Sequence, residues 1–91
     1  MTAIFDDVQN RILALVRTIL DHNSIVAEVL PESRLVDIGL TSLDMVNLML
    51  SVEAEFDLTL PQSEITGENF RSVQMMVEMI DKQLRPGIGL S

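Results

Sequence analysis

The sequence predicts an all-α protein, a small bundle of three main helices with one further short helix and a long first loop. Apolar residues recur at steps of three and four along three segments, which is the spacing of one helix face. The chain has 91 residues and is 47% hydrophobic, which is enough for one core and too short for a second domain. We therefore expect one domain over residues 1–85 and a flexible C-terminal tail over residues 86–91.

The first helix is expected over residues 3–20. Thr2 can cap it, and Asp6 and Asp7 suit the positive N-terminal end of a helix. Its apolar stripe comprises Phe5, Val8, Ile12, Leu15, Val16 and Ile19.

A connection of about twenty residues, 21–41, follows and is long for so small a domain. Its many apolar residues predict a loop that packs on the core, with a helical turn near residues 25–30. Pro31 and Gly39 interrupt any longer element. The apolar residues are Ile25, Val26, Val29, Leu30, Leu35, Val36, Ile38 and Leu40.

The second helix is expected from Ser42 to about Phe56, with Thr41 or Ser42 as the cap and Asp44 in the first turn. It has two apolar stripes, whereas a helix in a small bundle needs one. Either neighbours bury the helix on both sides, or the second stripe is exposed and meets a partner protein. The first stripe is Met45, Leu48, Met49, Val52 and Phe56, and the second stripe is Leu43, Val46, Leu50 and Ala54.

A linker with Pro61 comes next, although FDLTL at residues 56–60 could form a short strand. Thr66 is expected to cap a one-turn helix over residues 66–70. Ser72 is expected to cap the last helix, over residues 72–84. Lys82 and Arg85 suit its negative C-terminal end. The inward residues of this helix are Val73, Met76, Val77, Ile80 and Leu84.

Composition excludes several functions. The formal net charge is −8 and the pI is about 4.3, which argues against nucleic acids and anionic membrane surfaces and favours protein partners with basic patches. Cysteine is absent and His22 is the single histidine, so we expect no metal site. No apolar run reaches the ~20 residues of a membrane span, and the N-terminus lacks a signal pattern. We expect a cytoplasmic protein.

Enzymatic activity is not expected. The residues around Ser42 do not form a G-x-S-x-G nucleophile elbow, and no Walker A loop, dinucleotide fingerprint or HExxH motif is present. Ser42 can simply cap the second helix. It can also be an attachment point, because a phosphate at the first turn would face free backbone N–H groups and the positive helix end.

The chain resembles the acyl carrier protein family over nearly its whole length. The family pattern is an Asp-Gly loop end, a serine followed by leucine, a helix ending in Phe-Asp, and later a Pro, a Phe and a Ser-Val that opens the last helix. Its elements here are Asp37, Gly39, Leu40, Ser42, Leu43, Phe56, Asp57, Pro61, Phe70, Ser72 and Val73.

This resemblance implies a four-helix bundle, and a carrier domain over residues 1–85. It implies that a separate phosphopantetheinyl transferase attaches 4′-phosphopantetheine to Ser42. The thiol of this prosthetic group would then hold an acyl or aminoacyl group as a thioester. Further partners would be a loading ligase and downstream acyltransferases or synthases. We expect a monomer that presents acyl intermediates in a specialised lipid or secondary-metabolite pathway. An aminoacyl or peptidyl carrier, or a degenerate domain that only binds proteins, are the alternatives.

Two departures from the family pattern concern recognition. Thr41 replaces the aspartate that usually precedes the serine, and Asn47 and Ala54 stand where fatty-acid carriers often have acidic residues. Partner binding should therefore depend more on apolar contacts than on salt bridges. The expected partner face comprises Leu43, Asp44, Val46, Asn47, Leu50 and Glu53.

Overall fold

The computed structural model describes residues 3–84, and it confirms the all-α prediction. This part of the chain contains no strand, and residues 57–60 of the FDLTL segment lie outside any helix. The main helices keep close to their expected bounds, and a short 3-10 helix lies in the linker. The elements are α1 (Ala3–His22), α2 (Leu35–Ile38), α3 (Ser42–Phe56), the 3-10 helix η1 (Gln62–Glu64) and α4 (Val73–Leu84).

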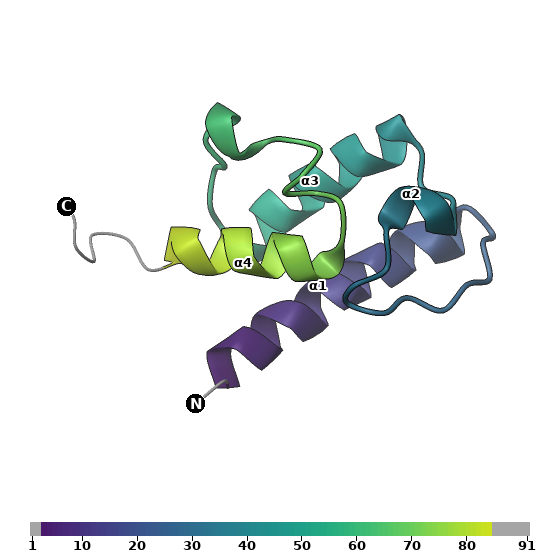
Figure 1. Ribbon diagram of the computed structural model, residues 1–91, viewed down its shortest axis with the longest axis horizontal. Coiled ribbons are helices and arrows are strands. Elements are labelled where there is room, and N and C mark those ends of the chain that lie inside the picture. The colour runs from purple at the N-terminus through teal and green to yellow at the C-terminus, as the bar shows by residue number, and fades with distance from the viewer. Residues whose placement is uncertain (1–2, 85–91) are drawn as a thin grey trace.

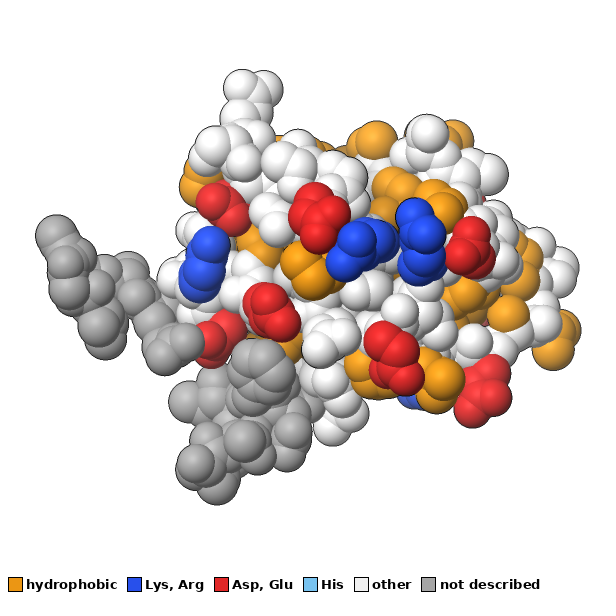
Figure 2. All heavy atoms as spheres, viewed as in Figure 1, with side chains coloured by type: hydrophobic (Ala, Val, Ile, Leu, Met, Phe, Trp, Pro, Cys, Tyr) orange, Lys and Arg blue, Asp and Glu red, His pale blue; other side chains and the backbone are white. Residues whose placement is uncertain are grey.

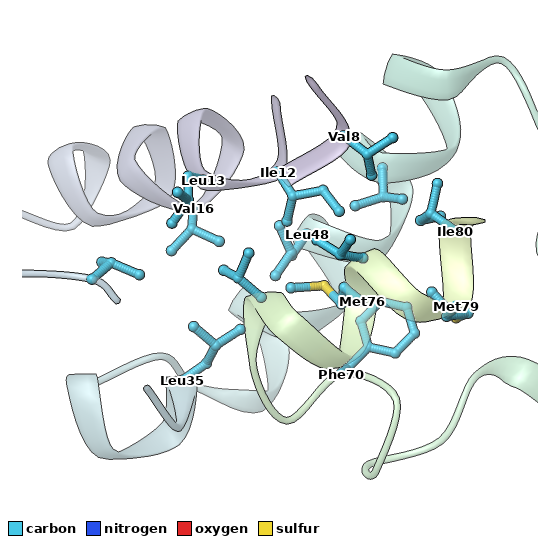
Figure 3. Packing of buried hydrophobic residues seen from close by; sticks show 14 of the residues in the cluster. Val8, Ile12, Leu13, Val16, Leu35, Leu48, Phe70, Met76, Met79 and Ile80 are labelled. Carbon is cyan, nitrogen blue, oxygen red and sulfur yellow. The ribbon is translucent and has the colours of Figure 1, made fainter. Parts of the chain in front are cut away.

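Helix α1 packs against both α3 and α4. In Figure 1 it runs along the lower side of the molecule, with α3 and α4 above it and α2 at the end where α3 begins. The core lies between these helices (Figure 3), with side chains from α1, α3 and α4 pointing toward one another. Ile12, Val16, Leu48, Met76 and Ile80 have no exposed surface.

The long connection packs on the core as expected, but its helical turn was placed wrongly. A helix over residues 25–30 would need its apolar residues on one buried face, whereas Val29 is buried and Val26 and Leu30 are exposed. The short helix of this connection is α2 instead. Gly39 ends α2 with φ of 122°, a backbone conformation that side chains disfavour.

The segment between α3 and α4 also differs from prediction. Thr66 caps a turn as expected, since its Oγ1 accepts from the Asn69 N–H at 3.1 Å and its carbonyl from the Phe70 N–H at 3.2 Å. That single turn does not continue into a helix, and the short helix of the segment is η1. The Ser72 cap is confirmed, with Oγ accepting from the Met75 N–H at 3.3 Å.

Helix α4 buries four of its five expected residues, but Leu84 is 41% exposed. Met79 is buried in its place. The expected cap Thr2, the residue Arg85 and the tail over residues 86–91 lie outside the described residues, as do the side chains of Phe5 and Asp6. Within residues 3–84, no helix combines the length and apolar character that a membrane crossing requires.

Arg11 connects α1 to the end of α3. Its Nε donates to Glu55 Oε2 at 2.8 Å and its Nη2 to the Glu55 carbonyl at 2.8 Å. The guanidinium also lies 4.4 Å from the centre of the Phe56 ring, a cation–π contact. The hydrogen bond to Glu55 raises the pKa of Arg11, so this cation stays charged while it holds the two helices together.

Candidate functional site

The start of α3 is built by a reciprocal capping box. Thr41 Oγ1 accepts from the Asp44 N–H at 3.2 Å, and Asp44 Oδ2 accepts from the Thr41 N–H at 2.9 Å. This pair provides acceptors for two backbone N–H groups at a helix end, where such groups have no acceptor within the helix. Thr41 is therefore the cap, and Ser42 is the first residue of the helix.

Ser42 is left free by this arrangement. It is exposed, and the capping role that could have explained it belongs to Thr41. Within the described part of the chain, no acceptor is found for the N–H groups of Ser42 and Leu43. A helix of 15 residues places its positive end here, so a phosphodiester on the hydroxyl would meet unpaired donors and a favourable field. The residues present fit a phosphate-linked group.

Asp44 is part of this capping box and supports the start of the helix. The sequence placed it on the surface that meets a partner, but it is only 9% exposed. The backbone hydrogen bond from Thr41 lowers the pKa of Asp44, and a side-chain hydrogen bond from Asn23 lowers it further. Its carboxylate therefore stays ionised and fixes the end of the helix. The capping pair can be read from T-x-x-D in the sequence, whereas the contact from Asn23 cannot.

We expect the contribution of Asp44 to stability to depend on pH. Because the pKa of Asp44 is lowered on folding, the ionised form stabilises the fold above the unfolded pKa of about 3.9 and this contribution is lost as the pH falls toward the folded pKa. Asp44→Asn should lower the urea midpoint of unfolding at about pH 6, and the difference from the wild type should shrink below about pH 3.

The control is Asp37→Asn, which changes the charge equally at an exposed position of α2. It should leave the midpoint nearly unchanged at both pH values. A difference for Asp44→Asn that persists undiminished in acid would show that the carboxylate charge is not what stabilises the helix end.

The second stripe of α3 is exposed. Leu43 is 69%, Val46 49% and Leu50 53% exposed, and Ala54 is exposed too. The alternative in which neighbours bury both stripes is therefore wrong. The first stripe faces inward, with three members buried and two, the methionines, half-buried. Asn47 is exposed beside the second stripe.

The three acidic residues of α3 are all engaged within the protein. Besides Asp44 at the start, Glu53 Oε2 accepts from the Leu60 N–H at 2.8 Å, and Glu55 is held by Arg11. Glu53 was expected on the partner face, but it is half-buried and closes the loop after the helix. The exposed side of α3 therefore presents mainly apolar and amide side chains.

A groove of about 540 Å³ lies beside this helix face. Its walls come from α2, α3 and the segment between η1 and α4. Figure 2 shows Lys and Arg side chains next to each other on one face of the molecule, with acidic side chains on either side and hydrophobic atoms nearby. The lining residues are Arg34, Val36, Met45, Val46, Met49, Ile65, Thr66, Gly67, Glu68, Phe70 and Arg71.

Sequence reasoning missed this groove, because its walls are far apart in the chain and join through backbone contacts that no motif indicates.

His22 is exposed at the end of α1. Among the residues that the structure describes, no group of three or more His, Asp or Glu side chains is placed to hold a metal ion.

A helical bundle with a free serine at the start of a capped helix is the form of a carrier protein. The model of the family described as "Phosphopantetheine attachment site" matches residues 10–80, and the chain belongs to this family. Its prosthetic group is therefore a covalent 4′-phosphopantetheine.

Two curated relatives cover almost the whole chain. Aminoacyl carrier protein 1 of Bradyrhizobium diazoefficiens is 59% identical over 94% of this chain and 96% of its own length. Aminoacyl carrier protein 2 of the same organism is 65% identical over 91% and 93%. An acyl carrier protein of Amoebophilus asiaticus is 39% identical over 64% of this chain and 71% of its own length.

Two solved structures are also similar to this chain. Both are complexes of a carrier protein with the Bradyrhizobium japonicum glycine:carrier protein ligase. In one the carrier is glycylated, and the match has a TM-score of 0.70, 62% identity and coverage of 79% of this chain and 97% of that one. The other includes an analogue of glycyl adenylate, with a TM-score of 0.73, 60% identity and coverage of 84% and 99%.

Proposed function

We propose that this protein is an aminoacyl carrier protein. Its phosphopantetheine arm is attached to Ser42 and holds an amino acid as a thioester. Glycine is the amino acid that we propose. The observation that supports this most is the 59–65% identity, over more than nine tenths of the chain, to two relatives named aminoacyl carrier proteins. The similar carriers solved with a glycine:carrier protein ligase agree with it.

The sequence pattern placed an acyl cargo and a lipid pathway first, with the aminoacyl carrier as the alternative. The relatives favour the alternative and give no support to fatty-acid metabolism. The match to an acyl carrier protein is weaker and covers only 64% of the chain. The surface agrees with this, because each of the three acidic residues of α3 already has a hydrogen-bond or ion-pair partner within the chain.

The loading ligase is proposed to dock on the second stripe, with Leu43, Val46 and Leu50 as apolar contacts and Asn47 beside them. This surface adjoins Ser42, so a ligase that covers it also receives the arm. A separate phosphopantetheinyl transferase must act first, and a downstream enzyme must accept the aminoacyl group. The protein itself takes part as a carrier.

The test is glycine loading. The protein is converted to its holo form with a transferase and coenzyme A, and is then incubated with the Bradyrhizobium japonicum ligase, ATP and glycine. The thiol displaces AMP from glycyl adenylate, so the intact mass should rise by one glycyl group that hydroxylamine removes. The apo-protein, which lacks the thiol, should gain nothing. Holo-protein that gains no glycine, yet accepts a fatty acyl group from an acyl ligase, would restore the acyl reading.

A further inference from the structure

We propose that the groove beside Ser42 binds a segment of the partner ligase in which a carboxylate lies next to an apolar side chain. The carboxylate pairs with Arg34 at the rim, and the apolar side chain enters the groove. This inference rests on the proposed function, because the partner is the aminoacyl-loading ligase. The acidity of the chain suggests a partner with basic side chains, whereas this contact requires a partner carboxylate.

The groove lies on the same helix face as the attachment site. Met45, Val46 and Met49 line it, and they follow Ser42 by three, four and seven residues, the spacing of one side of a helix. Val46 belongs both to the groove and to the exposed second stripe. An enzyme that reaches a group on Ser42 therefore meets the stripe and the groove together.

Arg34 is the free cation of this groove. It is exposed, and no hydrogen bond or ion pair of its side chain is found among residues 3–84. The other arginine, Arg71, is paired with Glu68 at 3.3 Å. Arg34 is nevertheless held in place, because the next residue, Leu35, donates its N–H to the Arg71 carbonyl at 2.9 Å. An unpaired guanidinium on a fixed backbone is suited to bind a carboxylate in a bidentate manner.

The charges that line the groove favour a negatively charged group on the partner. With the α3 carboxylates engaged internally and Glu68 paired to Arg71, the unpaired charge that lines the groove is positive. The net charge of −8 acts on a partner at long range, where salt screens it. A direct contact at the groove depends on the charges within a few ångströms. A partner with a basic residue there would be repelled by Arg34, and one with a carboxylate would be favoured.

The walls of the groove suit an apolar side chain. Val36 is 61% and Ile65 39% exposed, so both leave apolar surface open to water where they line the groove. Met45 and Met49 are half-buried on the opposite wall, and methionine adapts its shape to an inserted group. A partner side chain placed here would remove apolar surface from water on both walls.

The experiment measures the dissociation constant between the holo-protein and the Bradyrhizobium japonicum ligase by calorimetry. Arg34→Glu reverses the charge at the rim, and Arg17→Glu makes the same change at an exposed position of α1. We expect Arg34→Glu to raise the dissociation constant about tenfold and Arg17→Glu to change it less than about twofold. The effect of Arg34→Glu should diminish between about 50 and 300 mM salt.

Ile65→Ser tests the apolar part of the site without changing charge, and should raise the dissociation constant about threefold or more. All variants should keep the melting temperature of the wild type, since the changed side chains are exposed. Equal constants for Arg34→Glu and Arg17→Glu, with the wild type binding and accepting glycine, overturn this inference alone. A wild type that neither binds the ligase nor accepts glycine overturns the proposed function, and this inference with it.

Discussion

Ser42→Ala should abolish attachment of the prosthetic group completely. Incubated with a phosphopantetheinyl transferase and coenzyme A, the wild type should gain the mass of one phosphopantetheine and the variant none. The hydroxyl oxygen of Ser42 is the atom that would form the phosphodiester bond, and no neighbouring hydroxyl shares its position. Thr41, the nearest candidate, has its oxygen engaged with the Asp44 N–H at 3.2 Å.

The variant should remain folded, which makes the loss interpretable. Ser42 is exposed and does not cap the helix, and alanine is the best helix former. Its melting temperature should therefore match that of the wild type. Ser63→Ala, at an exposed serine of η1, is the matched control and should accept one phosphopantetheine. A Ser42→Ala protein that still gains the mass would move the attachment site to another residue.

The threonine before Ser42 need not impair modification for structural reasons. Thr41 completes both hydrogen bonds of the capping box, and an aspartate in its place would accept from the same N–H group. The replacement removes a negative charge beside the serine while it keeps the shape of the helix end. Any effect of Thr41 on the transferase would therefore be electrostatic.

Much of the fold could be predicted because the apolar spacing of the helices is regular. Val8, Ile12 and Val16 are buried as their spacing predicts. Spacing could not decide whether the second stripe of α3 was core or surface, since the first and second stripes both have apolar residues at helical intervals. It also misplaced the short helix near residues 25–30, because burial in a loop depends on what packs against it. Exposed Val26 and buried Val29 have the same residue type.

The candidate site was predictable in part. Ser42 was predicted from its position at a helix start and from the family resemblance, and the structure shows it exposed at that position. The cofactor follows from the family. The hydrogen bonds of Asp44 and Glu53 to backbone N–H groups were not predicted, because a carboxylate in the sequence does not show whether it binds a partner or its own chain. Arg34 and Arg71 were not singled out, since 37 positions separate them in the sequence and only the folded chain brings both to one groove.

Two identical substitutions on α3 should have opposite consequences for stability and for loading. Leu48 has no exposed surface, whereas Leu50, two residues later, is 53% exposed on the second stripe. A buried Leu→Ala change leaves a cavity and costs about 2–5 kcal/mol, whereas an exposed substitution changes stability by about half a kcal/mol. Leu48→Ala should therefore lower the melting temperature by roughly 10 °C or more, and Leu50→Ala by only a few degrees.

Loading should follow the reverse order, because a small interface depends on a few apolar anchors. At a temperature where both variants are folded, Leu50→Ala should raise the KM of the ligase for the holo-protein about tenfold, while Leu48→Ala should leave it near the wild-type value. Urea unfolding and steady-state glycylation on the same samples give both quantities. If Leu50→Ala unfolds as readily as Leu48→Ala, the second stripe is core after all. If it is stable and loads normally, the stripe is exposed but the ligase binds elsewhere.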